Sequence, residues 1–119
     1  MVTRPPRKMG LVKRRLFCIQ TSLQATVQQL TLPPEQRPLL VDVRTPQEFS
    51  QGHIPGALNI PVDELRRRLG EFPRDRQIAV YCQVGQRGYL ATRILQQAGF
   101  SAANIGGGYK TYRLWYPQA

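Results

Sequence analysis

Apolar positions along the chain form short continuous runs separated by polar, turn-forming segments. Leu39 to Val43 is one such run, and Gln77 to Cys82 contains another in Ile78 to Tyr81. Runs of this length without strict alternation are typical of strands covered on both faces. Shorter apolar segments predict three further strands, at Leu16 to Ile19, at Leu58 to Ile60, and in a segment that ends at Asn104-Ile105.

Helix-forming patterns lie between these strands. Thr45, Pro46 and Glu48 are the residue types expected at the N-cap, the first helical position and the capping-box glutamate of a short helix. Four more helices are predicted: after Thr21 or Ser22, from Pro61 through Leu69, from Arg87 or Gly88 to Ala98, and from Tyr109 toward Trp115. Because strands and helices alternate, we predict an α/β fold with a central, mostly parallel sheet of about five strands and helices on both faces.

Positive charge is concentrated at the start of the chain. The formal net charge is +10, and residues 1–15 contribute +6 of it through six arginines and lysines without an acidic residue. We interpret residues 1–15 as a basic, flexible tail and residues 16–119 as one domain. The tail has no aromatic residues among its basic ones and no recognition-helix or RNA-binding motif, which argues against specific nucleic-acid binding.

Composition excludes several kinds of site. The two cysteines, Cys18 and Cys82, form no CxxC pair, and His53 is the one histidine, so the ligands of a zinc site are missing and no metal is expected. No apolar run is long enough to cross a membrane or to form the core of a signal peptide. We therefore expect a cytoplasmic protein without membrane contact and with reduced thiols.

The loop that follows the strand Gln77 to Cys82 carries the candidate chemistry. Cys82 opens it, Gly85 permits a tight turn, and Arg87 closes it at the start of a helix. Successive loop amides form a nest for an anion, the helix N-terminus adds partial positive charge, and Arg87 adds a cation that can grip an anionic substrate. These features favour a nucleophilic thiolate at Cys82. Cys18 lacks such surroundings and is interpreted as a core residue, with a resolving thiol as the alternative.

With these residues in view, the segment from Leu39 to Trp115, 77 of the 119 residues, resembles a single rhodanese-like domain. The resemblance rests on Leu40 to Arg44 with Glu48, on the turn Gly52 to Ala57, on the loop Cys82 to Arg87, and on Gly107-Gly108 followed by a helix that reaches Trp115. Gln77 to Leu90, with Gly107 to Tyr112, is especially similar to the rhodanese domain fused to coenzyme A disulfide reductases. The resemblance implies a rhodanese-like α/β fold and a sulfurtransferase.

The implied mechanism is a double displacement through a persulfide on the catalytic Cys82. A sulfane sulfur moves from a persulfide, polysulfide or thiosulfate donor to Cys82 and then to a thiol or cyanide acceptor, without an organic cofactor. Loop amides would hold the persulfide, which makes the loop the expected substrate-binding segment: Gln83, Val84, Gly85, Gln86, Arg87 and Gly88.

Gln83 departs from the pattern of many thiosulfate-using members, which have a second arginine directly after the cysteine. Losing one cation disfavours the thiosulfate dianion and favours a less charged or larger donor, such as a polysulfide or coenzyme A persulfide. The acceptor is a small thiol or a partner protein.

The resemblance also places Asp42 and Arg44 near the loop. These two residues support the loop or contact the substrate, or they form an internal ion pair that supports the fold. His53 is interpreted as a turn residue rather than a general base, and Trp115 and Tyr109 as core and lid residues.

Three alternatives remain beside sulfur transfer. Cysteine phosphatases of the same fold place five residues between cysteine and arginine, whereas four separate Cys82 from Arg87, a narrower ring that suits one sulfur atom. A non-enzymatic interaction module would use the basic tail for docking. A related possibility is a sulfur relay to a particular protein, with little turnover of small acceptors. Cys82 as a small buried residue at the end of a strand is the structural alternative.

Overall fold

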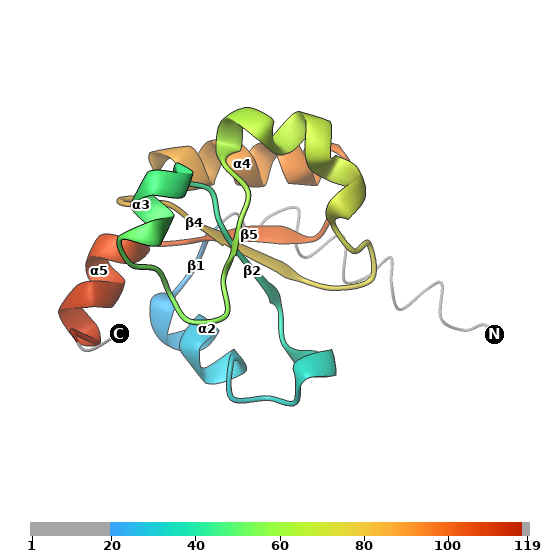
Figure 1. The fold of residues 1–119 in the computed structure, drawn as a ribbon. Coiled ribbons are helices and arrows are strands. Elements are labelled where there is room, and N and C mark those ends of the chain that lie inside the picture. Colours follow the sequence, from blue (N-terminus) through green and yellow to red (C-terminus); the bar gives the residue numbers. More distant parts are fainter. Residues whose placement is uncertain (1–19, 118–119) are drawn as a thin grey trace.

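The computed structural model describes residues 20–117, with five strands and the helices between them (Figure 1). The strands are β1 Gln20–Thr21, β2 Leu39–Asp42, β3 Leu58–Asn59, β4 Ile78–Tyr81 and β5 Ala102–Ile105. The helices are α2 Leu23–Gln29, α3 Pro46–Ser50, α4 Gln86–Gln97 and α5 Gly108–Trp115, and the 3₁₀ segments are η1 Pro34–Gln36 and η2 Val62–Glu71.

The strands form one sheet in the order β1-β5-β4-β2-β3, and every pairing is parallel. This confirms the predicted α/β fold. The predicted strand Leu16 to Ile19 lies outside the described residues, as do Cys18 and the basic tail 1–15; the first described strand is β1. Ser22 rather than Thr21 is the N-cap of α2, because its side chain accepts from the amide of Ala25.

Helices cover both faces of the sheet, so the two faces of each central strand enter separate apolar clusters. Val41 of β2 and Val80 of β4 pack on the side of α4 and η2, whereas Leu40 and Tyr81 pack on the side of α2 and α5. Figure 1 shows α4 on one side of the sheet and α2 on the other. The continuous apolar runs of β2 and β4 follow from this two-sided burial.

The helix predicted to open at Pro61 is a 3₁₀ segment, η2, instead of a regular α-helix. Its N-cap is Pro61, and Arg68 has non-helical backbone angles of φ −111° and ψ 20°. Leu65 is fully buried, and Val62 and Leu69 pack against the same core, as their spacing predicts. The segment packs against α4, and its apolar spacing does not distinguish this tighter coil from an α-helix.

Parallel pairing brings the carboxyl ends of the strands to one edge of the sheet. Asp42 is aligned with Tyr81, and Val80 with Asn104. Cys82, the segment after β2 and the glycines after β5 consequently meet at this edge, where open α/β sheets bind their ligands.

Candidate active site

Cys82 is the first residue after β4 and is buried, with 1% of its surface exposed. The amide of Gly85 donates to the Cys82 Sγ at 3.0 Å. Gly85 makes this contact with φ at +134°, a backbone conformation that favours glycine, and it is also the N-cap of α4. The sharp turn therefore directs one main-chain donor at the sulfur and begins the next helix immediately afterwards.

The first turn of α4 supplies further donors beside the sulfur. Gln86, Arg87 and Gly88 open the helix, and amides at these positions have no acceptor within the helix itself. Together with the helix dipole they make this end of α4 a favourable place for negative charge. Within the loop, Val84 is 56% exposed and Gly88 is buried.

The start of α5 holds the loop from the other side. The amide of Tyr109 donates to the Cys82 carbonyl at 2.7 Å, and the amide of Lys110 donates to the Gln83 carbonyl at 3.0 Å. Gly108 has φ at +60°, and a side chain there would collide with the Cys82 and Gln83 carbonyls. The sequence shows the glycine pair but not its contact with the loop, which depends on how β5 lies beside β4.

Asn104 lies behind the loop and was not identified from the sequence. Its Nδ2 donates to the Gly85 carbonyl at 3.2 Å. Its Oδ1 is buried without a hydrogen-bond partner among the described residues, and a Cβ on Gly88 would collide with it. Asn104 therefore supports the Gly85 peptide and requires glycine in the first turn of α4.

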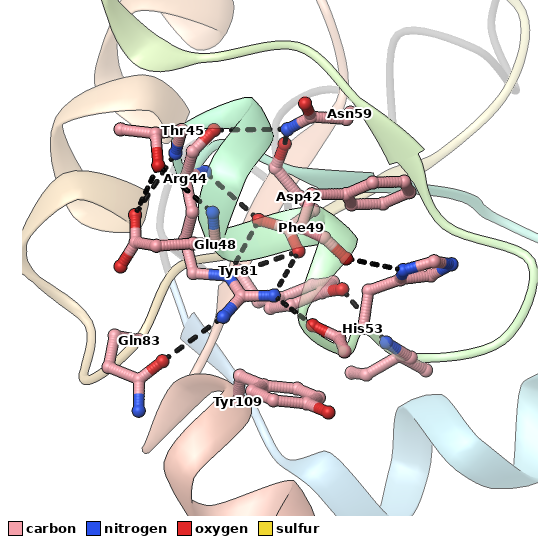
Figure 2. A network of polar contacts seen from close by, with 12 residues as sticks. Asp42, Arg44, Thr45, Glu48, Phe49, His53, Asn59, Tyr81, Gln83 and Tyr109 are labelled. Atoms are coloured by element: carbon pink, nitrogen blue, oxygen red, sulfur yellow. Dashed lines mark hydrogen bonds and ion pairs between the residues drawn. The ribbon is translucent and has the colours of Figure 1, made fainter.

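The ion pair of Asp42 and Arg44 is buried beside the loop, with exposures of 0% for Asp42 and 3% for Arg44. Arg44 Nη2 lies 2.7 Å from Asp42 Oδ2, and its Nη1 donates to Gln83 Oε1 at 3.2 Å (Figure 2). Burial opposes the charge, but the hydrogen bonds and the negative charge of Asp42 outweigh it and raise the pKa of Arg44. The pair is thus internal to the fold and contacts the loop through Gln83.

Arg87 is paired with Glu48 from α3. Arg87 Nη1 lies 2.8 Å from Glu48 Oε1, and Nη2 donates to Oε2 at 3.1 Å. The hydrogen bonds from Arg87 are the main cause that lowers the Glu48 pKa to about 2. Glu48 also completes the capping box that was predicted with Thr45. The sequence pattern identified the cap, but the ion pair of Glu48 with Arg87, 39 residues away, depends on the fold.

His53 and Trp115 lie outside the loop contacts. The His53 ring stacks on Phe49 with centroids 3.7 Å apart, and its Nδ1 lies 2.9 Å from the Phe49 carbonyl oxygen (Figure 2), consistent with a turn residue. Tyr109 is buried, and the Arg44 guanidinium lies 4.4 Å from its ring centroid. Trp115 is 60% exposed, so a place in the core is wrong for it: α5 ends at this residue, beyond the edge of the core.

Two hollows flank the loop. One, of about 460 Å³, is lined by Arg44, Glu48, Gln51, Gly52, Gln83, Tyr109, Lys110, Arg113 and Leu114. The other, of about 390 Å³, is lined by Val84, Gly85, Gln86, Tyr89, Asn104 and Gly107. Residues 20–117 contain no cluster of side chains suited to a metal ion and no helix long and apolar enough to span a membrane.

Comparison with known proteins identifies a common domain. Residues 26–114 match the family described as Rhodanese-like domain. The chain is 45% identical over 71 residues to a sulfurtransferase of Allochromatium vinosum. This alignment covers 59% of this chain and 66% of that protein. It is also 37% identical over 91 residues to the human thiosulfate:glutathione sulfurtransferase, in an alignment that covers 64% of this chain and 79% of that protein.

A solved structure, reduced CoADR-RHD of Bacillus anthracis, superposes with a TM-score of 0.77 and 40% identity. The match covers 86% of this chain and 18% of that one. The chain thus spans less than two thirds of the Allochromatium protein and corresponds to a small part of the Bacillus enzyme.

Proposed function

The chain belongs to the rhodanese-like domain family, and from this premise we propose that it is a sulfurtransferase that carries a sulfane sulfur on Cys82. The observation that carries the proposal is the Gly85 amide 3.0 Å from the Cys82 Sγ, at the N-terminus of α4. A main-chain donor in this position stabilises a negatively charged sulfur. The names of the relatives, which include sulfurtransferase and thiosulfate:glutathione sulfurtransferase, support the same reaction class.

The first half-reaction loads the enzyme. The Cys82 thiolate attacks the outer sulfur of a persulfide donor, the sulfur–sulfur bond of the donor breaks, and the donor leaves as a thiol or thiolate. With thiosulfate the same attack would release sulfite. Each version leaves a persulfide anion on Cys82, with no change in the total charge.

The second half-reaction unloads it. An acceptor thiolate attacks the outer sulfur of the Cys82 persulfide, the bond to Sγ breaks, and the thiolate of Cys82 is restored. The acceptor leaves as a persulfide; with cyanide the product is thiocyanate. Amides in the first turn of α4, at Gln86, Arg87 and Gly88, have no acceptor within the helix and would stabilise the terminal sulfur in this scheme.

Gln83 bears on the choice of donor. Its side-chain oxygen accepts from Arg44, so this position offers a neutral amide where many thiosulfate-using relatives have a cation. We propose a low-molecular-weight persulfide or polysulfide as the preferred donor and a thiol as the acceptor. The likeness to CoADR-RHD makes coenzyme A persulfide one donor to assay. A cysteine thiol of a partner protein would accept the sulfur by the same reaction.

The test is intact-protein mass spectrometry after incubation with a glutathione persulfide, a polysulfide or thiosulfate. We expect the wild-type protein to gain the mass of one sulfur atom on Cys82 and to lose it when a thiol or cyanide is added. Cys82→Ser removes the nucleophile, so sulfur gain should vanish and turnover should fall by roughly a thousandfold or more. A chain that gains no sulfur from any donor would support an interaction module instead.

A second assay separates sulfur transfer from phosphate chemistry. The ring from Cys82 to Arg87 has four intervening residues, and the Arg87 guanidinium is paired with Glu48. We therefore expect no Cys82-dependent hydrolysis of a phosphate monoester such as p-nitrophenyl phosphate. Hydrolysis by the wild type that Cys82→Ser abolishes would reverse the assignment.

A further inference from the structure

The hollow of about 460 Å³ extends from the Cys82 loop along α5. Gln83 lines it at the loop end, and the amide of Lys110 is bonded to the Gln83 carbonyl. Arg113 and Leu114 line it farther along the helix, and both are exposed. A molecule in this hollow would therefore extend from the residue next to the nucleophile toward the last turns of α5.

The charges around this hollow are not balanced. Arg44 is neutralised by Asp42, and Glu48 is neutralised by Arg87. Lys110 and Arg113 are exposed, and neither belongs to an ion pair with any residue that the structure describes. Two uncompensated positive charges thus lie on the α5 side of the hollow.

Their spacing places these two cations on one face. Lys110 and Arg113 are three residues apart on α5, which puts them about one turn, roughly 4.5 Å, along the helix axis. Arg113 Nη1 donates to the Tyr109 hydroxyl at 3.4 Å, which holds the guanidinium over the wall of the hollow. The hollow on the other side of the loop has no charged lining residue.

Gln83, which follows the nucleophile Cys82, is uncharged, in contrast to Lys110 and Arg113. Arg44 donates to the Gln83 Oε1, and the amide nitrogen of Gln83 points away from Arg44 (Figure 2). Gln83 also lines the hollow. A neutral amide therefore lines the hollow at the residue that follows Cys82, whereas the two cations line it from α5. This arrangement is complementary to a substrate whose negative charge is separated from its sulfur by several bonds.

We propose that Lys110 and Arg113 form an anion-binding site for the sulfur acceptor, a small thiol with a carboxylate or phosphate group remote from its sulfur. The remote group binds the two cations while the thiol reaches the Cys82 loop. This inference rests on the proposed sulfur transfer and deepens it by naming the substrate class. Compact thiosulfate, whose charge sits beside its sulfur, does not span the hollow in this way.

The experiment compares matched acceptors with the double variant Lys110→Gln/Arg113→Gln. Glutathione and its diethyl ester carry the same thiol and differ in their carboxylates; 4′-phosphopantetheine and pantetheine differ in one phosphate. In the double variant, the KM of each anionic acceptor in the second half-reaction, divided by the KM of its partner that lacks the carboxylate or phosphate charge, should rise by about fivefold. The wild-type preference for the anionic acceptors should weaken as salt is added. The pair that responds more strongly identifies carboxylate or phosphate as the preferred group.

The matched control is Arg66→Gln/Arg67→Gln, which makes the same change in charge at two exposed residues of η2 outside the hollow. It should leave the ratio of the two KM values as in wild type. Equal changes for anionic and neutral acceptors, or the same shift in both double variants, would overturn the proposal. Urea unfolding midpoints show whether each variant is folded.

A binding measurement separates failure of this inference from failure of the sulfurtransferase assignment. S-methylglutathione cannot react, so its binding can be followed by NMR titration whether or not Cys82 acquires sulfur. We expect S-methylglutathione to cause chemical-shift changes at α5. The dissociation constant obtained from them should be about fivefold higher for Lys110→Gln/Arg113→Gln than for the wild type. Persulfide formation on Cys82 without this discrimination would overturn the anion site alone; discrimination without persulfide formation would overturn the reaction alone.

Discussion

Two arginine–carboxylate pairs flank the Cys82 loop, and they differ mainly in burial. Asp42 and Arg44 are 0% and 3% exposed, whereas Glu48 and Arg87 are 34% and 36% exposed. Both pairs have short contacts, of 2.7 Å and 2.8 Å. Distance alone therefore does not distinguish them, but the surrounding medium does.

The difference in burial predicts different roles. In the interior, loss of one partner leaves an uncompensated charge and costs about 3–5 kcal/mol, whereas an exposed pair is worth about 0–1 kcal/mol because water screens it. Arg44 also bonds to the Gly52 carbonyl and to Gln83, so its position is specified by several contacts. We infer that Asp42 and Arg44 set the shape of the site, whereas Glu48 adjusts the charge and orientation of Arg87.

The largest effect is expected from Arg44→Met, which keeps the apolar stem and removes the cation. Asp42 would stay buried without its partner, so the free energy of unfolding should fall by about 3 kcal/mol in urea denaturation. The double variant Asp42→Asn/Arg44→Met should recover part of this loss, because no charge is stranded. A loss no greater than that of Glu48→Gln would contradict the distinction between the pairs.

A smaller effect, on activity rather than stability, is expected from Gln83→Arg. The substitution replaces the acceptor of Arg44 with a second cation beside the loop, so thiosulfate use should rise by about tenfold in kcat/KM relative to a persulfide donor. Gln97→Arg makes the same change in charge at the exposed last residue of α4, at the end of the helix away from the loop, and is the matched control. An unchanged preference between thiosulfate and the persulfide donor would show that Gln83 does not determine the choice of donor.

The smallest effect is expected from Glu48→Gln, which should lower the free energy of unfolding by no more than about 1 kcal/mol at neutral pH. Because the Glu48 pKa is lowered from 4.5 to about 2, its contribution is fully present above pH 4.5 and is lost as the pH falls toward 2. The stability difference between wild type and Glu48→Gln should therefore shrink over this interval in urea denaturation. A difference that grows on acidification would show that the pair does not stabilise the fold.

Much of the local structure followed from residues close together in the sequence. The apolar runs located β2 and β4, and Thr45 with Glu48 formed the predicted capping box. Gly99, with φ at +95°, directly follows the C-cap of α4, a place where glycine is common. These features depend on backbone propensity and on contacts within a few residues, so they can be recognised without the fold.

The contacts that complete the candidate site depend on residues far apart in the sequence. Arg44 with Gln83 and Arg87 with Glu48 are each separated by 39 residues, and Asn104 reaches Gly85 across 19. Their meeting depends on the parallel register of β2, β4 and β5, which no local pattern specifies. The 3₁₀ form of η2 and the exposure of Trp115 likewise depend on what the rest of the chain packs against them.

The sequence by itself determined how strands and helices alternate along the chain, the α/β class and the place of Cys82 at the end of a strand and before a helix. The tertiary structure decided which charges are neutralised: Arg44 and Arg87 belong to ion pairs, whereas Lys110 and Arg113, beside the hollow, form no ion pair within residues 20–117. Local order is encoded by short-range periodicity and capping. Charge compensation depends on distance and burial, which exist only once the sheet has brought separate segments together.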